Sequence, residues 1–267
     1  MQTLSNKLYR VSMTLNNKEK ICKLLKGIET GDPSSVSVVN EEKYIQHNPQ
    51  THEGSEGLAE LFKRLSKTSP RVNIVRVFED GDFVFAHTEY DFATRNIGFE
   101  IFRFESGYAV EHWDNIQKRK ELNSSGHSMV DGKTEVTDHE MTESNRSFIK
   151  SFVEEILIQG NFDKLNGYIN QENYTEHSPN LGDNLVELKR ILSRSSNDTS
   201  AFIEYKKCHR ILAEGSFVLS VCEGYVNQTH SSFFDLFHLK GGKIIEHWDT
   251  TEAIPPCSEW KNSNGKF

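Results

Sequence analysis

The sequence has little cysteine and no apolar run near its start, and each absence excludes a class of protein. Four cysteines occur among the 267 residues, and no Cys-x-x-Cys is present. A disulfide framework or a zinc ribbon is therefore not expected, and we expect reduced thiols, three of them buried or partly buried. Residues 1–15 lack the hydrophobic segment of a signal peptide or a spanning helix. We therefore expect a cytoplasmic protein that is not associated with a membrane.

An excess of positive charge is also absent. The chain has 31 Lys and Arg against 39 Asp and Glu, which gives a net charge of −8 at pH 7. Such a protein repels phosphate backbones, and its basic residues are scattered along the sequence instead of forming a stripe. Nucleic acid is therefore not an expected partner.

Signatures of a cofactor or a metal site are missing as well. No glycine-rich phosphate loop, dinucleotide fingerprint or nucleophile elbow occurs. His112 precedes Asp114 by two residues, as His247 precedes Asp249, and either pair could contribute to a metal site. No spacing in the sequence supplies a third ligand. We expect neither a cofactor nor a metal.

What the sequence does contain is a repeat. The tetrapeptide Glu-His-Trp-Asp occurs at 111–114 and again at 246–249. Residues 44–49 match residues 174–179 at nearly the same separation, roughly 130–135 residues. A period of this length is the size of a small domain, and 17 phenylalanines with 36% hydrophobic residues suffice for two modest cores. The sequence therefore predicts a tandem duplication.

The repeat sets the expected domain boundaries. We predict a first domain at 1–120, a linker at 121–142, and a second domain at 143–257. The linker is rich in Asn, Ser, Gly and charged residues, and it has little apolar periodicity. The polar tail at 258–267 is expected to lie on the surface.

Apolar residues with a helical period open both halves. In residues 21–28 they recur at i, i+3, i+4 and i+7, and Gly31 follows as a stop. Residues 148–157 repeat the pattern before Gly160. Both stripes are typical of helices that pack on a core.

Each half then changes from a helical period to a period of two. Shorter helices are expected at 58–65 and 185–192, and the strand patterns that follow are broken at Gly81, Gly107 and Gly241. Helices followed by hairpins indicate an α+β fold, with helices on one face of a curved antiparallel sheet.

The last hairpin of the first half carries candidate catalytic residues. With a two-residue turn at Ser106-Gly107, Glu100 would face Trp113 and Phe102 would face Glu111, all on one side of the sheet. A β-bulge would break this register. The hairpin therefore predicts two carboxylates among aromatic rings.

The second half repeats this arrangement. A turn at Gly241-Gly242 would place Asp235 opposite Trp248 and Phe237 opposite Glu246. A carboxyl group in apolar surroundings near another acid resists ionisation, which suits general acid–base catalysis near neutral pH. Asp235 and Glu100 are the leading candidates. The alternative is that these acids only bond backbone or tyrosine hydroxyl groups at the rim of the sheet.

Histidines supply further candidates. His87 alternates with apolar residues along a strand, and Val221 stands at its position in the second half, two residues before Glu223. His47 and His177 each lie in a turn two residues before a proline. His87 or His177 could stabilise an oxyanion, and His47 could line the pocket, but each of the three could instead be a structural residue.

These segments resemble a known family. Residues 44–49, 80–87 and 99–114 resemble the SnoaL-like polyketide cyclases of the nuclear-transport-factor-2-like superfamily, and 174–179 and 234–249 repeat the resemblance. Over nearly its full length the chain is also similar to two-copy bacterial proteins predicted to be SnoaL-like aldol-condensation enzymes.

The resemblance implies a fold and a chemistry. It implies two tandem cones, each a curved sheet wrapped by helices around an apolar pocket, that pair sheet to sheet within one chain, as a monomer or in a homodimer. In the cyclases an aspartate at the place of Asp235 is the acid–base catalyst of a cofactor-free aldol closure. Glu100 departs from this pattern in the first half, and His238 departs in the second half, where Arg103 is its counterpart.

We therefore expect a protein that binds a small hydrophobic carbonyl compound. As an enzyme it would use Asp235 or Glu100 to move a proton beside the carbonyl, while His87 or His177 stabilises the enolate oxygen. The alternative is a non-catalytic ligand-binding or scaffold protein, and hydration or epoxide opening is a third option, since one fold hosts many functions. The residues expected to line the pockets are Tyr44, His47, Phe102, Glu111, Trp113, Tyr174, Glu223, Phe237, Glu246 and Trp248.

Overall fold

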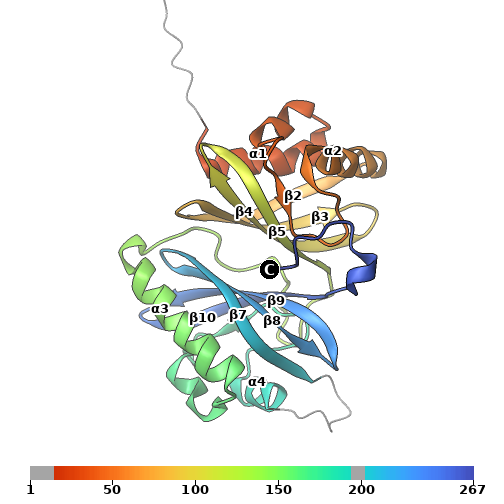
Figure 1. The fold of residues 1–267 in the computed structure, drawn as a ribbon. Coiled ribbons are helices and arrows are strands. Elements are labelled where there is room, and N and C mark those ends of the chain that lie inside the picture. The colour runs from red at the N-terminus through yellow and green to blue at the C-terminus, as the bar shows by residue number, and fades with distance from the viewer. Residues whose placement is uncertain (1–14, 194–201) are drawn as a thin grey trace, which may run out of the picture.

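The computed structural model describes residues 15–193 and 202–267, which form two five-stranded sheets with helices (Figure 1). We refer to residues 15–118 as the N-terminal half and to residues 139–253 as the C-terminal half. The elements of the N-terminal half are α1 (Asn17–Thr30), η1 (Pro33–Val38), β1 (Ile45–Gln46), α2 (Gly54–Leu65), η2 (Ser66–Thr68), β2 (Arg71–Asp80), β3 (Phe83–Asp91), β4 (Arg95–Glu105) and β5 (Tyr108–Lys118).

The C-terminal half repeats this order of elements. They are η3 (His139–Met141), α3 (Thr142–Phe152), η4 (Val153–Ile158), η5 (Phe162–Gly167), β6 (Thr175–Glu176), α4 (Leu185–Leu192), β7 (Ile203–Glu214), β8 (Phe217–Val226), β9 (Thr229–Lys240) and β10 (Lys243–Ala253), and η6 (Cys257–Glu259) follows. The strand orders are β1-β5-β4-β3-β2 and β6-β10-β9-β8-β7, antiparallel except for the parallel pairs of β1 with β5 and of β6 with β10. The expected α+β architecture is confirmed, with a five-stranded sheet in each half.

Local sequence explains where the helices begin and end. Asn16 and Glu19 form a reciprocal capping box at the start of α1, and Gly31 ends that helix in the left-handed conformation. The expected helix at 148–157 is formed by α3 and its π-helical continuation η4, which Gly160 follows with φ of 72°. No helix within residues 15–193 or 202–267 is long and apolar enough to span a bilayer.

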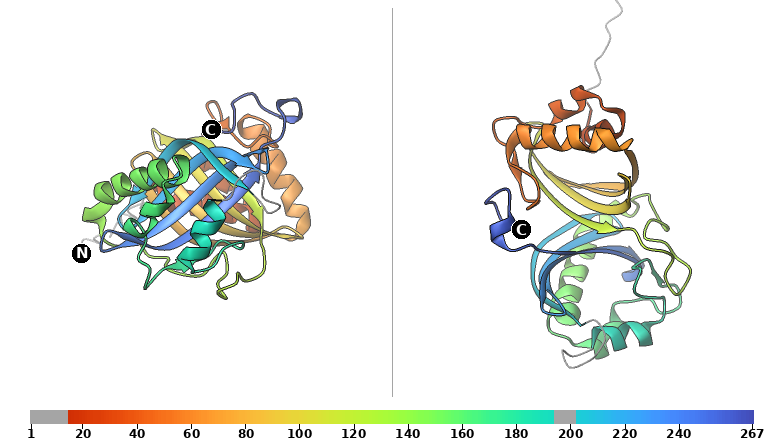
Figure 2. Two further views of the ribbon diagram at one scale, coloured as in Figure 1. Left: turned by 90° about the horizontal axis from the view of Figure 1, so that it is seen from below. Right: turned by 90° about the vertical axis from the view of Figure 1, so that its right-hand side faces the viewer.

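The sheets face each other, and the helices lie on the outside (Figure 2). In each half, a hydrophobic core separates the sheet from its helices. A third core joins the two sheets and contains, among others, Phe85, Phe99, Trp113, Leu219 and Trp248. Each sheet is therefore buried on both faces, one toward its own helices and one toward the other half.

Arginines cross this interface in a reciprocal manner. The guanidinium carbon of Arg76 lies 4.2 Å from the ring centre of Trp248, and that of Arg210 lies 4.0 Å from the ring centre of Trp113. Each half thus gives an arginine to a tryptophan of the other, which is the pattern of an isologous contact.

The hairpin register of the N-terminal half differs from the prediction. A bulge between Arg103 and Phe104 shifts the pairing by one residue, so that Glu100 pairs with Asp114 and Ile101 with Trp113. Because side chains alternate along a strand, a shift of one residue moves every later side chain to the other face. Trp113 therefore lies on the face opposite to Glu100.

The C-terminal half has the same bulge, here between Ile244 and Glu246. Asp235 pairs with Asp249, and Trp248 pairs with Leu236. The predicted pairing of Asp235 with Trp248 is wrong for the same reason as in the N-terminal half.

Two extended segments close the molecule. The linker segment (residues 119–138) packs against the C-terminal half, where the carbonyl oxygen of Ser128 lies 3.0 Å from His177 Nδ1. The tail segment (residues 254–267) returns to the N-terminal half, where the carbonyl oxygen of Gly265 lies 2.8 Å from His47 Nδ1. The two segments thus bond matched histidines.

The tail segment is less exposed than the sequence suggests. Ser258 and Glu259 are exposed, but Lys266 is 4% exposed and its ammonium donates to the carbonyl oxygen of Asp114 at 2.8 Å. The end of the chain lies between the two halves (Figure 1). The expected surface position is therefore wrong for the end of this segment, because backbone and carboxylate acceptors of both halves bind its lysine.

Candidate functional site

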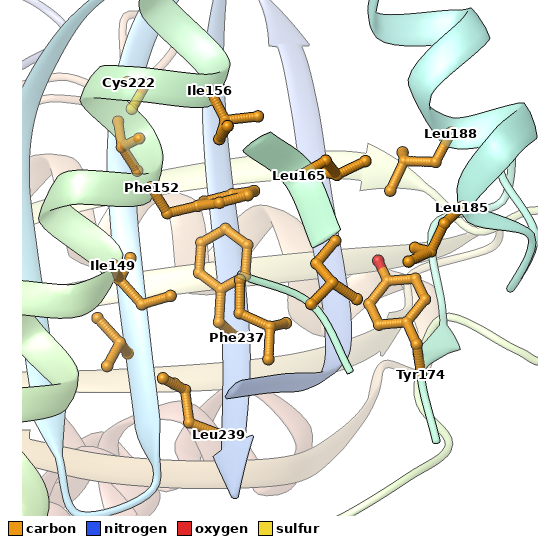
Figure 3. Close-up of a cluster of buried hydrophobic side chains, with 14 of the residues drawn as sticks. Ile149, Phe152, Ile156, Leu165, Tyr174, Leu185, Leu188, Cys222, Phe237 and Leu239 are labelled. Atoms are coloured by element: carbon orange, nitrogen blue, oxygen red, sulfur yellow. The ribbon is translucent and has the colours of Figure 1, made fainter. Parts of the chain in front are cut away.

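Each half encloses a cavity between its sheet and its helices. The cavity of the C-terminal half has a volume of about 280 Å³, and that of the N-terminal half about 300 Å³. Apolar side chains form most of the walls. Two of them in the C-terminal cavity are Phe152 of α3 and Phe237 of β9, whose ring centres lie 5.4 Å apart in the hydrophobic cluster of Figure 3. Of the expected pocket residues, Tyr44 and Phe102 line the N-terminal cavity, and Tyr174 and Phe237 line the C-terminal one.

The floor of the C-terminal cavity carries a chain of acidic and basic groups centred on His247. Its Nδ1 lies 2.8 Å from Glu176 Oε1, and its Nε2 lies 3.2 Å from Asp235 Oδ1. Burial opposes protonation of the imidazole, but the two carboxylates outweigh burial and raise the pKa of His247 well above its usual value. His247 is therefore an imidazolium held between two acids near neutral pH.

Asp235, a catalytic candidate predicted from the sequence, is held in place by these hydrogen-bonded groups. It is 2% exposed, and the Tyr205 hydroxyl donates to its Oδ1 at 3.1 Å. Its other oxygen, Oδ2, has no hydrogen-bond partner among the residues described by the structure. The carboxylate is thus fixed through one oxygen and free through the other in a cavity that it lines.

Asp249 is a second acid in this cavity, and sequence reasoning treated it only as half of a metal-binding pair. It is the cross-strand partner of Asp235 and lines the same cavity. Burial, together with the charges of Asp235 and Glu176, raises the pKa of Asp249 to about 7. The last residue of the Glu-His-Trp-Asp repeat was the available signal, but the bulge that turns it into the cavity has no mark in the sequence.

The N-terminal cavity has a related floor with a different charge pattern. His112 Nε2 lies 2.7 Å from Glu100 Oε2, while its Nδ1 lies 3.0 Å from the amide oxygen of Gln46. Gln46 therefore takes the place that Glu176 has in the C-terminal half. Asn48 donates to Asp114 Oδ2 at 2.6 Å. This floor has one carboxylate on its histidine where the other floor has two.

A tyrosine holds the central acid in both halves, but it comes from different strands. Tyr90 of β3 donates to Glu100 Oε1 at 2.7 Å, and its cross-strand partner is Val72. In the C-terminal half Tyr205 lies on β7, opposite Gly224. The tyrosine thus lies on β3 in the N-terminal half but on β7, the counterpart of β2, in the C-terminal half, while its hydroxyl reaches the acid in both.

One cluster has the composition of a metal site. Ligand atoms of Glu100, His112 and Asp114 lie within 4.8 Å of one another, and all three residues are buried. They are already engaged, since His112 bonds Glu100, Asn48 bonds Asp114, and the Lys266 ammonium lies 3.6 Å from Asp114 Oδ1. Protein groups therefore compensate part of the negative charge of this cluster, and the expectation that no metal binds stays a prediction.

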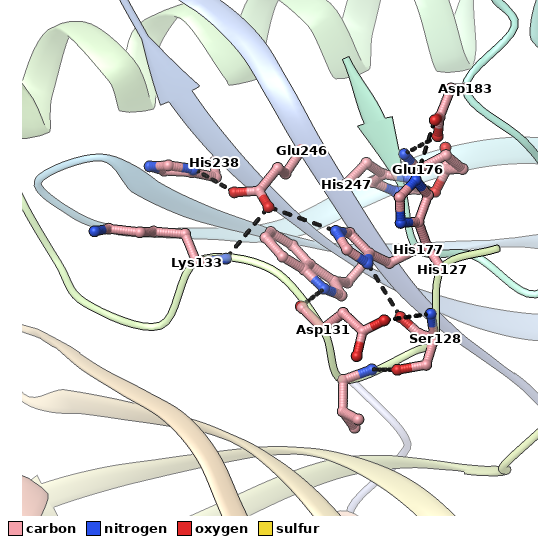
Figure 4. A network of polar contacts seen from close by, with 12 residues as sticks. His127, Ser128, Asp131, Lys133, Glu176, His177, Asp183, His238, Glu246 and His247 are labelled. Atoms are coloured by element: carbon pink, nitrogen blue, oxygen red, sulfur yellow. Dashed lines mark hydrogen bonds and ion pairs between the residues drawn. The ribbon is translucent and has the colours of Figure 1, made fainter. Parts of the chain in front are cut away.

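The two histidines expected to stabilise an enolate lie on the other face of the sheets. His87 is fully buried between the halves, and its Nδ1 lies 2.5 Å from a guanidinium nitrogen of Arg76. Burial and the charge of Arg76 lower the pKa of His87 well below its usual value. His177 stacks on Trp248 with ring centres 4.6 Å apart, next to Glu246 (Figure 4). Neither histidine lines a cavity described here, so the predicted position of both is wrong.

The remaining residues that were expected to line the pockets also lie outside both cavities. The side chains that face the other half, the linker segment or the tail segment are His47, Glu111, Trp113, Glu246 and Trp248. Glu223 pairs with His209 and His230 of its own half and lines neither cavity. The bulges turn Glu111, Trp113, Glu246 and Trp248 away from the cavities. Burial raises the pKa of Glu246, but the hydrogen bond with His238 and the His177 imidazole 3.5 Å away outweigh burial and lower the pKa to about 2, so Glu246 is a structural anion.

Comparison with known proteins supports a SnoaL-like domain in the N-terminal half. Residues 23–112 match the family model described as SnoaL-like domain. No curated protein matches the chain. TsrD from Streptomyces laurentii is 20% identical, with 39% of this chain and 92% of that chain covered and a TM-score of 0.34.

Two further solved structures are similar at the same level. An NTF2-like protein of unknown function from Cytophaga hutchinsonii is 19% identical, over 45% of this chain and 95% of its own, with a TM-score of 0.32. An LEH-like epoxide hydrolase from M. tuberculosis is 19% identical, over 42% of this chain and 84% of its own, with a TM-score of 0.33. The family model covers the N-terminal half alone, so a second SnoaL-like copy stays a prediction.

Proposed function

We propose that the protein is a cofactor-free acid–base enzyme that acts on a small hydrophobic carbonyl compound in the C-terminal cavity, by aldol condensation. The observation that carries the proposal is the Glu176–His247–Asp235 chain, which ends in a free carboxylate oxygen at the floor of an apolar cavity. A positioned base in a water-poor site is what proton abstraction beside a carbonyl requires.

Asp235 and Asp249 have complementary roles in this proposal. Asp235 accepts hydrogen bonds from Tyr205 and from the His247 imidazolium through Oδ1, which leaves Oδ2 available to take a proton from the substrate. Asp249 has a pKa of about 7 and retains a proton in a large fraction of molecules at neutral pH. Neighbouring carboxyl groups whose environments differ in this way are typical of a base paired with an acid.

The reaction then follows from these roles. Asp235 Oδ2 takes the proton from the carbon beside the substrate carbonyl, while Asp249 gives its proton to the carbonyl oxygen, and an enol forms. The enol carbon attacks a second carbonyl carbon, and a carbon–carbon bond forms. The new alkoxide oxygen takes the proton from Asp235, and the enol O–H returns its proton to Asp249. Both acids end in their starting states.

We propose further that the chain arose by duplication of one SnoaL-like unit, with boundaries near 1–120 and 143–257. The matched strand orders, bulges and Arg–Trp contacts support this origin. In this view the sheet-to-sheet contact within the chain serves as an internal dimer. The alternative of a scaffold with side chains filling both cavities is disfavoured by cavities of about 280 and 300 Å³.

The proposal can be tested without knowing the natural substrate. Exchange of the protons beside the carbonyl for deuterium is followed by NMR in D₂O for a panel of hydrophobic ketones and β-diketones. We expect the parent to accelerate exchange of at least one of them, and Asp235→Asn to lower that rate by about 100-fold or more, the size of one general base. Thermal unfolding of the variant checks that its fold is retained.

Glu100→Gln is the matched variant, because Glu100 has the corresponding position in the N-terminal cavity. If Glu100→Gln lowers the exchange rate and Asp235→Asn does not, the reaction belongs to the N-terminal cavity and our assignment is wrong. Exchange at the rate of buffer alone over the whole panel would favour the non-catalytic alternative.

A further inference from the structure

Two polar atoms of the N-terminal cavity lack partners. The hydroxyl of Tyr44 and the Oδ1 of Asp114 are both buried and have no hydrogen-bond partner in the described part of the chain. Tyr44 is 6% exposed and Asp114 is 5% exposed, and both line the cavity. Buried polar groups normally find a partner, since leaving one unpaired costs about 1–3 kcal/mol. Two such atoms in one cavity indicate that a bound molecule supplies their partners.

The replacement of an acid by Gln46 explains why Tyr44 is unpaired. In the C-terminal half, Tyr174 donates to Glu176 Oε2 at 2.5 Å. In the N-terminal half, the amide oxygen of Gln46 is engaged by His112 Nδ1 at 3.0 Å and by the backbone N–H of Asn48 at 2.8 Å. The Tyr44 hydroxyl is left facing the cavity without an acceptor.

Asp114 is satisfied on one side only. Asn48 donates to its Oδ2 at 2.6 Å, while the nearest cation, the Lys266 ammonium, lies 3.6 Å from Oδ1, beyond hydrogen-bond distance. Lys266 instead donates to the carbonyl oxygen of Asp114 and to Glu252 Oε2. Asp114 Oδ1 is therefore a buried acceptor without a hydrogen-bond donor among the described residues.

The surroundings define the head group that fits. Burial, with the charges of Glu100 and Asp114, raises the pKa of Tyr44 well above its usual value, so its hydroxyl keeps its proton and donates. Glu100, Asp114 and Glu252 line the cavity, which disfavours a buried carboxylate. Arg64 is exposed at the rim and leaves the floor without a guanidinium. The floor thus presents one donor and one acceptor.

We propose that the N-terminal cavity is a second, non-catalytic binding site for an apolar ligand whose neutral head group offers both an acceptor and a donor, as a carboxamide does. The Tyr44 hydroxyl donates to the carbonyl oxygen of the ligand, and the ligand N–H donates to Asp114 Oδ1. Leucines and phenylalanines of α1, α2 and β4 surround its apolar chain. This site is independent of the reaction proposed for the other cavity.

The test uses octanamide, octanoate and octylamine, which share one chain length and differ only in the head group. Each is titrated into the full chain by calorimetry at pH 7. We expect octanamide to bind about tenfold or more tightly than octanoate, because only the amide satisfies both unpaired atoms. Equal affinities for the three probes, or tightest binding of octylamine, would overturn the proposed head group.

Two substitutions locate the site and identify its contacts. Tyr44→Phe removes a hydroxyl that has no partner among the described residues, so the fold should be unaffected while octanamide binding weakens about five- to tenfold. Asp114→Asn keeps the bond with Asn48 and presents an N–H₂ where Oδ1 stood. This change should reverse the preference from octanamide toward octanoate. Unchanged affinities in both variants would mean that water alone fills the two positions, and the proposal would fail.

Leu58 and Leu188 provide a matched pair for the choice of cavity, since both are buried and each lines one of the two. Leu58→Trp should abolish octanamide binding by filling the N-terminal cavity, whereas Leu188→Trp should leave the affinity within about twofold. The opposite result would place the ligand in the C-terminal cavity and refute the assignment. Thermal unfolding confirms that both variants fold, and if Leu58→Trp does not, Tyr44→Phe decides.

Discussion

The floors of the two cavities differ most at one residue, which is Gln46 in the N-terminal half and Glu176 in the C-terminal half. Both side chains accept from the matched histidine, at 3.0 and 2.8 Å. The glutamate adds a charge, so His247 lies between two carboxylates, while His112 lies between a carboxylate and a neutral amide. The same backbone therefore supports a charged proton-transfer chain in one half and a floor with unpaired donor and acceptor atoms in the other.

Removing that charge is the strongest test of the comparison. Glu176→Gln should give the C-terminal floor the character of the N-terminal one and lower the rate of proton exchange about 100-fold, since His247 loses a carboxylate that stabilises its charge. A histidine titration by NMR should show the pKa of His247 falling in the same variant. Activity lost with an unchanged His247 titration would contradict this explanation.

The reciprocal substitution is the control. Gln46→Glu gives Tyr44 the acceptor that Tyr174 has, so it should weaken octanamide binding about tenfold without creating proton-exchange activity. Exchange that appears in this variant would show that the glutamate alone determines which half is active.

Asp249 should give the comparison a pH dependence. The fold raises the pKa of Asp249 to about 7, above its ordinary value of 3.8. The folded state therefore holds this proton more tightly than the unfolded state, so the unfolding free energy falls as the pH rises from 3.8 to 7, and the loss is complete above pH 7. Asp249→Asn removes this penalty, so the unfolding free energy of the variant relative to the parent should be about 2–3 kcal/mol higher at pH 8 than at pH 5. Urea unfolding at the two pH values measures this difference. A gain that is the same at pH 5 and at pH 8 would contradict a raised pKa for Asp249.

The smallest expected difference lies at the interface, where the halves are most alike. Arg76→Ala and Arg210→Ala each remove one cation–π contact with a tryptophan and should each lower the unfolding free energy by about 1–2 kcal/mol. Arg76 also donates to the carbonyl oxygens of Asp131 and Lys133, so its loss should be the larger of the two. Equal losses by chemical denaturation would show that these backbone contacts add nothing.

The architecture could be predicted from the sequence because it depends on periodicity. The apolar spacing in residues 21–28, the stop at Gly31 and the helix at 185–192 all appear in the structure where the patterns placed them. These signals are local and repeat twice, so each half supports the interpretation of the other.

The site could be predicted only in part, because it depends on register. Asp235 and Glu100 line the cavities as expected, since each lies on β4 or β9 ahead of the bulge. In β5 and β10 a bulge inserts one extra residue before Trp113 and Trp248, and no glycine or proline marks it in the sequence. Every side chain after the bulge therefore points to the opposite face of the sheet from the one predicted. Asp249 was missed for this reason. His87 and His177 were misplaced because nothing local shows that both faces of a sheet are buried.

The tail segment couples the folding of the two halves. It leaves β10 of the C-terminal half and covers the N-terminal half, where Asn262 donates to the carbonyl oxygen of Asn48 at 2.8 Å and Lys266 reaches Asp114. A fragment of residues 15–118 would thus lack a piece of its own covering, which the other fragment would carry. Separately produced fragments should be insoluble or unstable and should regain order when mixed, and the intact chain should melt in a single cooperative transition.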